Sequence, residues 1–497
     1  MRRAKDVEIA LAPRLAGVSL QRWLYAELRQ VILDGRLTPG ARLPASRDLA
    51  ERYQLSRGTV VSVFAQLSAE GYLTGAVGRG SFVASTLPEQ WLRASSTAHW
   101  VSSERQRSPP IIPQLSLRGQ LLARSPFPMA VRAFPARAFR ASQPDLAAFP
   151  IDLWVRTATR KARLSPRSLL TDGDVCGYLP LRQAIAEHLC AARGIRCSAE
   201  QVVVLGSVQQ VIDVSARLLL DPGDAVWMED PGYPGARQVL EAAGARIVGV
   251  PVDTLGMDVA AGRTLAPAAR LAYVTAGRQA PLGHPLALER RMALLAWAQQ
   301  AQAMVIEDDY DSEYNFTSGP LAALKSLDQA GRVIYCGTFS KLLFPALRLA
   351  YAVLPDSLMA PFTAALSLTC RHVALEPQLS LSAFIVEGHL GRHIRRMRQL
   401  YAERAEALQQ AAITHWAGLL HVPAIHTGLD APAFLPAGVD DKRVSRLAAA
   451  AGIETRPMSF YQVSQLPAPG LVLGFAAVGA GEIEAGARIL AQVLESL

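Results

Sequence analysis

The sequence predicts an α/β protein with two parts: a small N-terminal head of helices and a hairpin, and a large part built on a mainly parallel sheet. From about Leu121 onward, apolar runs of strand length alternate with helical patterns, which is typical of βαβ units. Residues 18–85 instead contain three short helical patterns followed by two short strands. At 497 residues the chain is too long for one ordinary domain, and 50% of it is hydrophobic, which is ample for a sizeable core.

Composition narrows the class of protein further. The formal net charge of +9 permits a polyanionic partner such as nucleic acid. The 5 cysteines are odd in number and lack the spacing of metal ligands, so we expect reduced thiols in a cytoplasmic protein and no metal site. We also expect no membrane contact, because the N-terminus lacks an apolar signal segment and no apolar run is long enough to span a bilayer.

The head is predicted to contain five elements. An apolar stripe from Leu20 to Ile32 predicts the first helix. A second helix begins at Ser46, and Ser56 is a good N-cap for a third helix that ends at Gly71. Two alternating segments then predict strands joined by a tight turn. The strands are Tyr72–Thr74 and Ser81–Val83, and the turn is Gly78, Arg79 and Gly80.

Three short helices followed by a hairpin describe a winged helix-turn-helix. In that geometry the first turn of the third helix enters the major groove of DNA, and here it carries Ser56, Arg57 and Thr59. Arg47 and the wing residue Arg79 would contact the flanking backbone or the minor groove. The alternative is a small helical domain with a solvated basic face, but the spacing of the motif favours the DNA-binding interpretation.

The segment from about Ser19 to Ala84 includes LPASRDLAERYQLSRGTVVSVFAQLSAEGYLTGAVGRGSFV and resembles the DNA-binding domain of the GntR family of bacterial regulators. The resemblance implies double-stranded operator DNA as a partner. It implies DNA contacts at Arg47, Arg57, Thr59 and Gly78. We expect a DNA-binding domain over residues 18–85, a Ser- and Pro-rich linker over 86–117 and a second domain over 118–497.

The large part is predicted to contain at least six strands, and ligand groups in such folds gather where strands meet the following loops. The predicted strands are Gln201–Leu205, Ala225–Met228, Arg246–Val250, Leu271–Thr275, Ala303–Ile306 and Val333–Cys336. The last of these is followed by a lysine, two hydroxyl groups and an arginine: Lys341, Thr338, Ser340 and Arg348.

This group of side chains suits an aldehyde that carries a phosphate, namely pyridoxal phosphate. Desolvation lowers the pKa of a lysine and frees its amine to attack carbonyl groups. Arginine suits phosphate because its planar fork binds bidentately. The alternative is a surface lysine after a strand, with Arg348 in an ordinary ion pair.

Three further strand ends carry groups that suit the same cofactor. They are Ser207, Val208 and Gln209, whose backbone N–H groups open a helix; Tyr233, which can stack on a flat ring; and Asp308 with Tyr310, which can bind a pyridine nitrogen and a phenolate oxygen. Each signal alone is weak, because a Glu-Asp-Asp run is more often a solvated or metal-like patch and a tyrosine is more often core. Jointly, and in this order, they favour a pyridoxal phosphate site.

Residues from about Leu169 to Leu497 resemble a fold-type I aminotransferase. The resemblance implies that Lys341 forms a Schiff base with pyridoxal phosphate, that Asp308 binds its pyridine nitrogen and that Tyr310 binds its ring oxygen. It also implies ring stacking by Tyr233 and phosphate binding by Thr338, Ser340, Arg348 and the loop of Ser207, Val208 and Gln209. A GntR-type head joined to such a body is the MocR-type architecture.

The sequence departs from the family's pattern mainly on the substrate side. The family usually has a tyrosine at Asp172 and a glycine at Ser207. Aminotransferases typically place an arginine for the substrate carboxylate where this chain has an apolar run around Val472. Arg278 and Arg456 are the two candidates to replace that arginine.

These resemblances imply a cytoplasmic transcription regulator that forms a homodimer, binds operator DNA and senses pyridoxal phosphate or a small amine or amino-acid effector. One alternative is an active aminotransferase with an accessory DNA-binding head. Another is a body that has lost its cofactor and serves only in dimerisation. The cofactor residues favour a body that binds pyridoxal phosphate, and the altered substrate side predicts little or no steady transaminase turnover.

Overall fold

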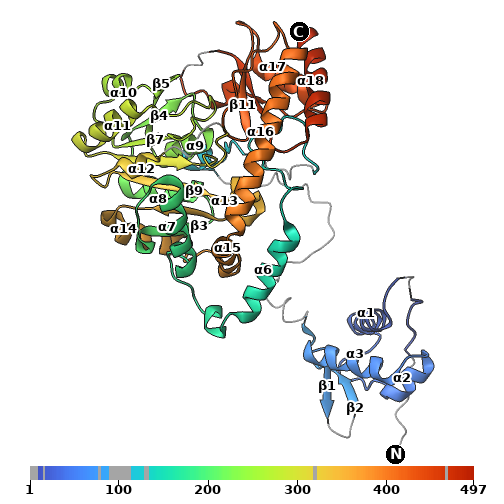
Figure 1. Ribbon diagram of the computed structural model, residues 1–497. Helices are drawn as coiled ribbons and strands as arrows, with labels where there is room; N and C mark the ends of the chain where they lie inside the picture. Colours follow the sequence, from blue (N-terminus) through green and yellow to red (C-terminus); the bar gives the residue numbers. More distant parts are fainter. Residues whose placement is uncertain are drawn as a thin grey trace, which may run out of the picture. The chain divides into compact units, whose positions relative to one another are not determined.

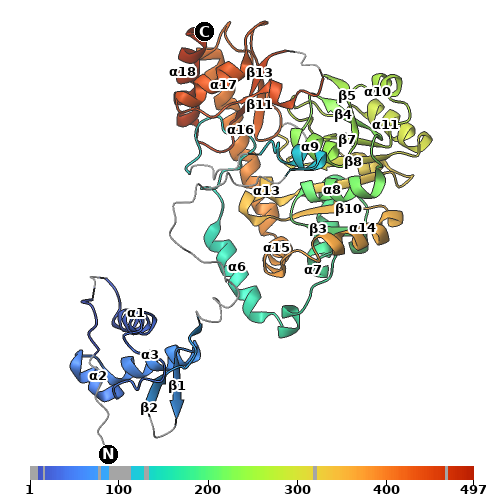
Figure 2. The same cartoon turned by 180° about the vertical axis from the view of Figure 1, so that it is seen from behind.

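The computed structural model describes residues 9–14, 17–76, 80–88, 114–127, 134–316, 322–464 and 468–497. The chain divides into two compact units, residues 1–112 and 113–497. Figure 1 and Figure 2 show the elements of each unit from opposite sides. Within the described ranges, no helix combines the length and the apolar character needed to cross a bilayer.

The head contains three helices and a hairpin in the predicted order. Its elements are α1 (Leu20–Leu33), α2 (Ser46–Arg52), α3 (Arg57–Ala69), β1 (Leu73–Ala76) and β2 (Gly80–Val83). Ser19 caps α1, because its hydroxyl accepts a hydrogen bond from the backbone N–H of Arg22 at 3.3 Å. Leu28 of α1 shares a hydrophobic core with Val60 and Leu67 of α3, and all three side chains are fully buried.

The two strands of the head form the predicted hairpin. They pair antiparallel, from Leu73 opposite Val83 to Ala76 opposite Gly80. The turn between them, with the predicted DNA contacts Gly78 and Arg79, lies outside the described residues. The expectations for these two residues therefore stay predictions.

The large unit is built on an eight-stranded sheet with the strand order β3-β10-β9-β8-β7-β4-β5-β6. The strands from β9 to β5 run parallel, whereas β10 runs antiparallel to both its neighbours and β6 runs antiparallel to β5. All six predicted strands are present, and β6 and β10 are additional. The bounds are β3 (Val202–Leu205), β4 (Ala225–Asp230), β5 (Arg246–Asp253), β6 (Gly256–Met257), β7 (Leu271–Val274), β8 (Met304–Asp309), β9 (Val333–Thr338) and β10 (Ala350–Val353).

Helices cover both faces of this sheet, because successive side chains of each strand point to opposite faces. Val226 and Met228 of β4 share a core with α8, α9 and α14. Trp227 points to the other face and stacks on Trp297 of α11, with ring centroids 3.7 Å apart. The helices are α5 (Leu117–Leu122), α6 (Ile151–Leu164), α7 (Leu179–Arg193), α8 (Val208–Leu219), α9 (Pro234–Ala242), α10 (Val259–Leu265), α11 (Leu288–Gln300), α12 (Leu324–Leu327), α13 (Phe339–Leu342), α14 (Asp356–Thr369), α15 (Leu375–Val386), α16 (His389–His415), α17 (Asp441–Ala450) and α18 (Ala480–Glu495). Short 3₁₀ turns are η1 (Arg167–Leu170), η2 (Ala199–Gln201), η3 (Pro345–Leu347) and η4 (Met458–Tyr461).

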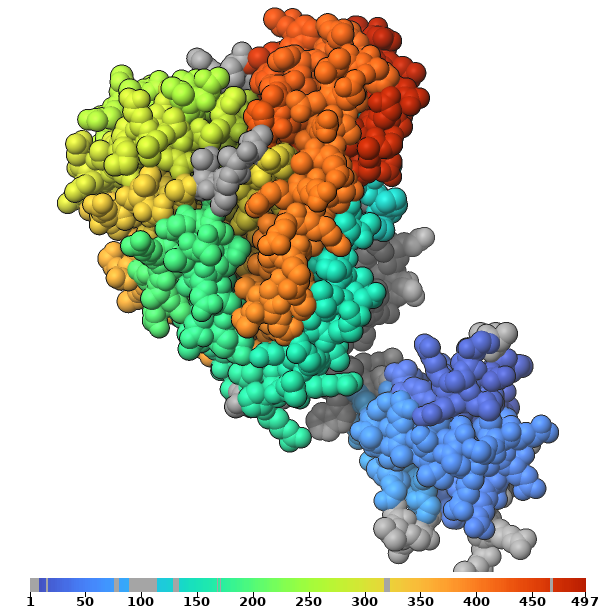
Figure 3. Space-filling view, viewed as in Figure 1, coloured from blue at the N-terminus to red at the C-terminus, as the bar shows by residue number. Residues whose placement is uncertain are grey.

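A second, three-stranded sheet follows near the C-terminus. Its strands β11 (Asp430–Phe434), β13 (Gly470–Gly474) and β12 (Arg456–Pro457) lie in that order and pair antiparallel. The long helix α16 lies along the surface of this part of the unit (Figure 3). Leu471 and Leu473 of β13 belong to the same buried core as Val204 of β3, so one continuous core joins the two sheets.

Candidate functional site

One cavity of about 380 Å³ in the large unit collects the predicted cofactor residues. All ten line it: Lys341, Asp308, Tyr310, Tyr233, Arg348, Thr338, Ser340, Ser207, Val208 and Gln209. They lie at the ends of β8 and β9 and in the loops and helix starts that follow β3, β4, β8 and β9, where these strands end at the same edge of the sheet. The wall that faces the second sheet includes Asp430, Arg456 and Val472.

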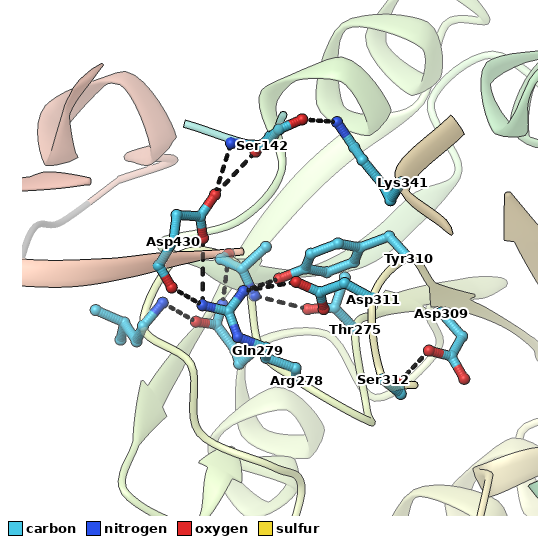
Figure 4. Close-up of polar contacts among 12 residues, drawn as sticks. Ser142, Thr275, Arg278, Gln279, Asp309, Tyr310, Asp311, Ser312, Lys341 and Asp430 are labelled. Carbon is cyan, nitrogen blue, oxygen red and sulfur yellow. Dashed lines mark hydrogen bonds and ion pairs between the residues drawn. The ribbon is translucent and has the colours of Figure 1, made fainter. Parts of the chain in front are cut away.

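Lys341 lies in α13, the short helix that directly follows strand β9. Thr338 caps this helix, because its hydroxyl accepts a hydrogen bond from the backbone N–H of Ser340 at 3.1 Å. The amine of Lys341 is half-buried and donates to the backbone carbonyl of Ser142 (Figure 4). Ser142 is held in turn by Asp430, whose Oδ2 accepts from both the N–H and the hydroxyl of Ser142 at 3.0 Å. The lysine is thus positioned by a chain of contacts that reaches the second sheet.

Asp308 lines the cavity, and one of its two carboxylate oxygens lacks a hydrogen-bond partner among the described residues. Its Oδ2 accepts a hydrogen bond from the hydroxyl of Tyr273 at 2.5 Å, whereas its buried Oδ1 has no hydrogen-bond partner among the described residues. Burial raises the pKa of Asp308 to about 7, although the Tyr273 bond and the nearby Lys341 favour the ionised form. A buried, unsatisfied acceptor is costly. This oxygen therefore suits a ligand that brings a donor or a positive charge, such as a protonated pyridine nitrogen.

The two carboxylates beside Asp308 have structural partners on the opposite side of strand β8. Glu307 accepts hydrogen bonds from the backbone N–H groups of Leu324 at 2.7 Å and Lys325 at 2.8 Å. Asp309 forms a fully buried ion pair with Arg193 at 2.6 Å. The Glu-Asp-Asp run is therefore neither solvated nor a metal cluster, and the described residues contain no group of three or more potential metal ligands.

Tyr310 is joined to a buried network around Arg278 (Figure 4). The guanidinium of Arg278 donates to the hydroxyl of Tyr310 at 2.8 Å and forms ion pairs with Asp311 at 3.3 Å and Asp430 at 3.2 Å. Arg278 is only 4% exposed and does not line the cavity. Arg278 therefore orients Tyr310 and Asp430, and its charge is already balanced by two carboxylates.

Three features of the remaining wall suit a phosphate and a flat ring. Ser207 caps α8, so the first backbone N–H groups of this helix face the cavity region, and helix N-termini favour anions. Arg348 is exposed and has left-handed backbone angles, with φ 51° and ψ 45°. Tyr233 lies close over Gly235, where an added Cβ would come within 2.6 Å of the tyrosine ring. The glycine therefore makes room for the position that this ring adopts.

The head presents its predicted DNA contacts on exposed helix starts. Ser56 caps α3 by accepting from the N–H of Thr59 at 3.1 Å, and the two hydroxyls lie 2.8 Å apart. Arg57 and Arg47, in the first turns of α3 and α2, are both exposed. Ser56 and Thr59 are thus partly occupied with capping the helix, whereas the exposed Arg57 takes no part in this cap.

Several residues of both sites were not found from the sequence. Tyr273 could have been found, because it is the one hydroxyl-bearing residue in an otherwise apolar strand, but no sequence feature pointed to Ser142 or Asp430. Ser142 lies 199 positions from Lys341 and 288 from Asp430, so only the fold brings them together.

In the head, the exposed Arg42 lies against Gly80 of the wing and is a further basic candidate for contact with DNA. Phe127 also lines the cavity, from a segment predicted only as the start of the second domain.

Comparisons with known proteins agree with this division into two parts. The family model for bacterial regulatory proteins of the gntR family matches residues 20–83, and that for aminotransferase class I and II matches residues 141–463. The chain is 38% identical over 466 residues to a protein of Rhizobium meliloti named "Probable rhizopine catabolism regulatory protein MocR", which covers 94% of this chain and 92% of that protein.

Two further relatives extend the comparison to a second regulator and to an enzyme. The pyridoxine biosynthesis transcriptional regulator PdxR of Corynebacterium glutamicum is 31% identical, over 81% of this chain and 81% of that protein. The crystal structure of the α-aminoadipate aminotransferase LysN of Thermus thermophilus, complexed with N-(5'-phosphopyridoxyl)-L-leucine, is 27% identical with a TM-score of 0.67, over 72% of this chain and 92% of that chain. The chain therefore belongs to the aminotransferase class I and II family and, through the gntR-family head joined to that body, to the MocR-type transcriptional regulators.

Proposed function

We propose that the protein regulates transcription by binding operator DNA through its head and pyridoxal phosphate through the cavity of its large unit. The observation that carries this proposal is the convergence of all ten predicted cofactor residues on one cavity, next to a buried carboxylate oxygen that lacks a partner. Two named regulators are similar to this chain over most of its length. A structural relative with a phosphopyridoxyl ligand supports the choice of cofactor.

The residues around the cavity fit the cofactor group by group. Asp308 would hold the pyridine nitrogen, Tyr310 the ring oxygen and Tyr233 the ring face. Thr338, Ser340, Arg348 and the start of α8 at Ser207, Val208 and Gln209 would hold the phosphate. When bound, pyridoxal phosphate supplies an aldehyde that amines attack reversibly, and its visible absorbance reports that change. Lys341 would supply the amine of the protein, held in place by the carbonyl of Ser142.

We further propose a small amine or amino acid as the effector, and a homodimer as the working form in the cytoplasm. Helix α6 supports the homodimer, because Ile151, Val155 and Leu164 stay 56%, 51% and 76% exposed on it. Figure 1 shows α6 beside α15, so these exposed side chains lie on a helix that is itself packed against the large unit.

Sedimentation equilibrium tests the homodimer. We expect a dimer for the wild type and weaker association for Val155→Asp. A monomeric wild type would contradict the proposed homodimer.

A spectroscopic experiment tests the proposed function directly. The full-length wild type should gain visible absorbance on addition of pyridoxal phosphate, and Lys341→Ala should not gain that band. Lys442→Ala, which removes an exposed lysine on α17, serves as the matched control and should behave as the wild type. A mobility-shift assay with promoter fragments tests the head. A wild type that stays colourless with added cofactor, or that binds no duplex in preference to others, would contradict the proposal.

A further inference from the structure

Arg278 is a buried arginine that lies just outside the cavity and directs one donor at a residue of its wall (Figure 4). It follows strand β7, is only 4% exposed and does not line the cavity. Its Nη1 donates to the hydroxyl of Tyr310 at 2.8 Å. Since a guanidinium carries donors and no acceptor, the oxygen of Tyr310 is the acceptor in this bond. The other arginine named from the sequence, Arg456, lines the cavity itself and donates to the hydroxyl of Tyr461 at 3.2 Å.

The hydroxyl proton of Tyr310 is left for a partner in the cavity. Tyr310 lines the cavity, and no acceptor among the described residues takes its proton. Burial raises the pKa of Tyr310 well above its usual value, although Arg278 acts against this, so the hydroxyl stays protonated. Tyr310 therefore presents a donor to the cavity, which suits a negatively charged oxygen such as the ring oxygen of pyridoxal phosphate.

Groups from separate elements fix the direction of the guanidinium. Arg278 pairs with Asp311, after β8, at 3.3 Å and with Asp430, on β11, at 3.2 Å, and it also donates to the backbone carbonyl of Asp430. Gly428, with φ 88°, leaves the space beside Nε, because a Cβ there would clash with the guanidinium. The charged groups that act most strongly on Tyr310 are Arg278, Asp311 and Asp430, and Arg278 is the one cation of these three.

A cation that donates to this hydroxyl strengthens the bond that the hydroxyl itself donates. Hydrogen bonds in a chain polarise one another inside a protein, and bonds with one charged partner are the stronger kind. A stronger donor at the ring oxygen favours the form of the cofactor in which that oxygen is negatively charged. The bound cofactor then loses the proton held at this oxygen at a lower pH, and the loss changes its visible absorbance.

We infer that Arg278 is a positioning residue that holds the Tyr310 hydroxyl as a donor to the ring oxygen of pyridoxal phosphate, and that it thereby lowers the pH at which the bound cofactor changes colour. The inference rests on the proposed function and deepens it. Arg278 acts through Tyr310 and touches no ligand, because it lies outside the cavity. An arginine at this position therefore serves the electronic state of the cofactor.

Absorbance of the full-length protein loaded with cofactor, recorded between about pH 5 and about pH 10, tests this inference. The main variant is Arg278→Met combined with Asp311→Asn, because removing one cation and one carboxylate together keeps the net charge beside Tyr310. We expect the midpoint of the colour change to rise by about 0.5–1 pH unit, the shift that one hydrogen bond accounts for. Asp311→Asn alone should not raise the midpoint. Arg278→Lys keeps the charge but replaces the fork by a single donor group, so its midpoint should lie between those of the wild type and the main variant.

A double-mutant cycle shows whether Arg278 acts through Tyr310. Tyr310→Phe should raise the midpoint at least as much as the main variant, and the main variant should add nothing further in the Tyr310→Phe protein. Arg404→Lys is the matched control, because Arg404 is also a buried arginine, pairs with Asp145 at 2.6 Å and lies outside the cavity. This control should keep the wild-type midpoint.

The outcomes separate failure of this inference from failure of the proposed function. A wild type that takes up the cofactor but has the same absorbance as the main variant at every pH overturns the inference alone. An equal shift with and without the Tyr310 hydroxyl also overturns it, because the arginine would then act by its charge and not through Tyr310. If the main variant does not fold, a wild-type midpoint in Tyr310→Phe or in Arg278→Lys overturns the inference. A wild type that gains no visible absorbance with added cofactor overturns the proposed function and the inference together.

Discussion

Arg348 is held in a backbone conformation that an arginine adopts only at a cost. Its φ of 51° places it in the left-handed region, which is less favourable for residues with a Cβ by about 1–2 kcal/mol. Such residues cluster at functional sites, and Arg348 lines the cavity. We expect Arg348→Gly to keep or raise the free energy of unfolding of the cofactor-free protein by up to about 1 kcal/mol. The same change should weaken cofactor binding by about 1.5–3 kcal/mol for each charge-assisted bond lost.

Two variants separate the backbone effect from the loss of the guanidinium. Arg348→Ala should weaken cofactor binding equally without relieving the backbone. Gln302→Gly should relieve a backbone with the same φ of 51° and leave the cofactor unaffected, because Gln302 does not line the cavity. Urea unfolding and absorbance titrations measure the two quantities. Unchanged cofactor affinity in both Arg348 variants would contradict the phosphate assignment.

Asp308 gives the cofactor-free protein a specific pH dependence. Burial raises the pKa of Asp308 to about 7, and Asp309 adds to this, while Tyr273 and Lys341 act against it. A folded-state pKa above the unfolded value of about 3.9 means that the folded state binds more protons between these pH values. The stabilisation is therefore complete below about pH 4 and is lost as the pH rises through about 7.

Asp308→Asn removes this dependence. We expect the difference in urea midpoint, wild type minus variant, to fall as the pH rises from about 4 to about 7 and then to level off. Asp172→Asn is the control, because the Asp172 side chain is 83% exposed and lies outside the cavity. A difference that stays constant across this range would contradict the assignment of a raised pKa to Asp308.

At the scale of elements, the sequence predicted the strands that carry the cofactor groups because each is a continuous apolar run that ends in polar residues. Strand β8 illustrates the limit of that reasoning. The alternation of a strand sends Asp308 to the cavity and Glu307 and Asp309 to the other side, yet the run alone does not tell which side is the cavity. That choice depends on Tyr273 and Arg193, which come from other elements.

Pairings between distant segments were beyond prediction for a related reason. Strand β10 is antiparallel inside a mainly parallel sheet, and a short apolar run does not encode its direction. The register that sets Arg456 opposite Val472 depends on where β12 and β13 meet, and these two residues lie 16 positions apart in sequence. The sequence named Arg278 and Arg456 as equal candidates, and only their partners distinguish them.

The first turn of α3 carries a prediction about DNA binding. Arg57 is exposed at a helix N-terminus, where the helix dipole and a capped backbone favour approach to DNA. Arg57→Ala should weaken DNA binding by about 1–3 kcal/mol and relax the sequence preference if Arg57 reads a base. Arg47→Ala should weaken binding to all sequences alike and lower the salt slope by about one. Arg22→Ala, which removes an exposed arginine on α1, is the control, and fluorescence anisotropy at several salt concentrations measures all three.

At the scale of the whole molecule, the segment that begins the large unit touches both the cavity and a helix that starts beside it. Helix α5 packs against α9, and the carbonyl of Leu121 accepts from the side chain of Gln238 at 2.6 Å. A few residues later, Phe127 lines the cavity. Helix α9 itself begins directly after Tyr233. The segment from α5 to Phe127 thus contacts both α9 and the cavity within the large unit.

This placement predicts that Phe127 transmits ligand binding to DNA affinity. Coupling between two sites requires an element whose arrangement both sites bias, and the coupling free energy is reciprocal. We expect Phe127→Ala to keep cofactor absorbance and the DNA affinity of the effector-free protein. The variant should lose most of the change in DNA affinity that an effective amine causes in the wild type.

The effect of operator DNA on amine affinity provides a second test of this prediction. In the wild type, operator DNA should change the amine's apparent affinity by the same factor by which the amine changes DNA affinity. In Phe127→Ala both factors should approach one together, because the coupling free energy between the two sites is reciprocal. Leu122→Ala is the matched control, since Leu122 is 56% exposed on α5 and does not line the cavity. If Phe127→Ala keeps the full factor, the signal reaches the head by another route, and exposed α6 with the proposed dimer contact is the next element to vary.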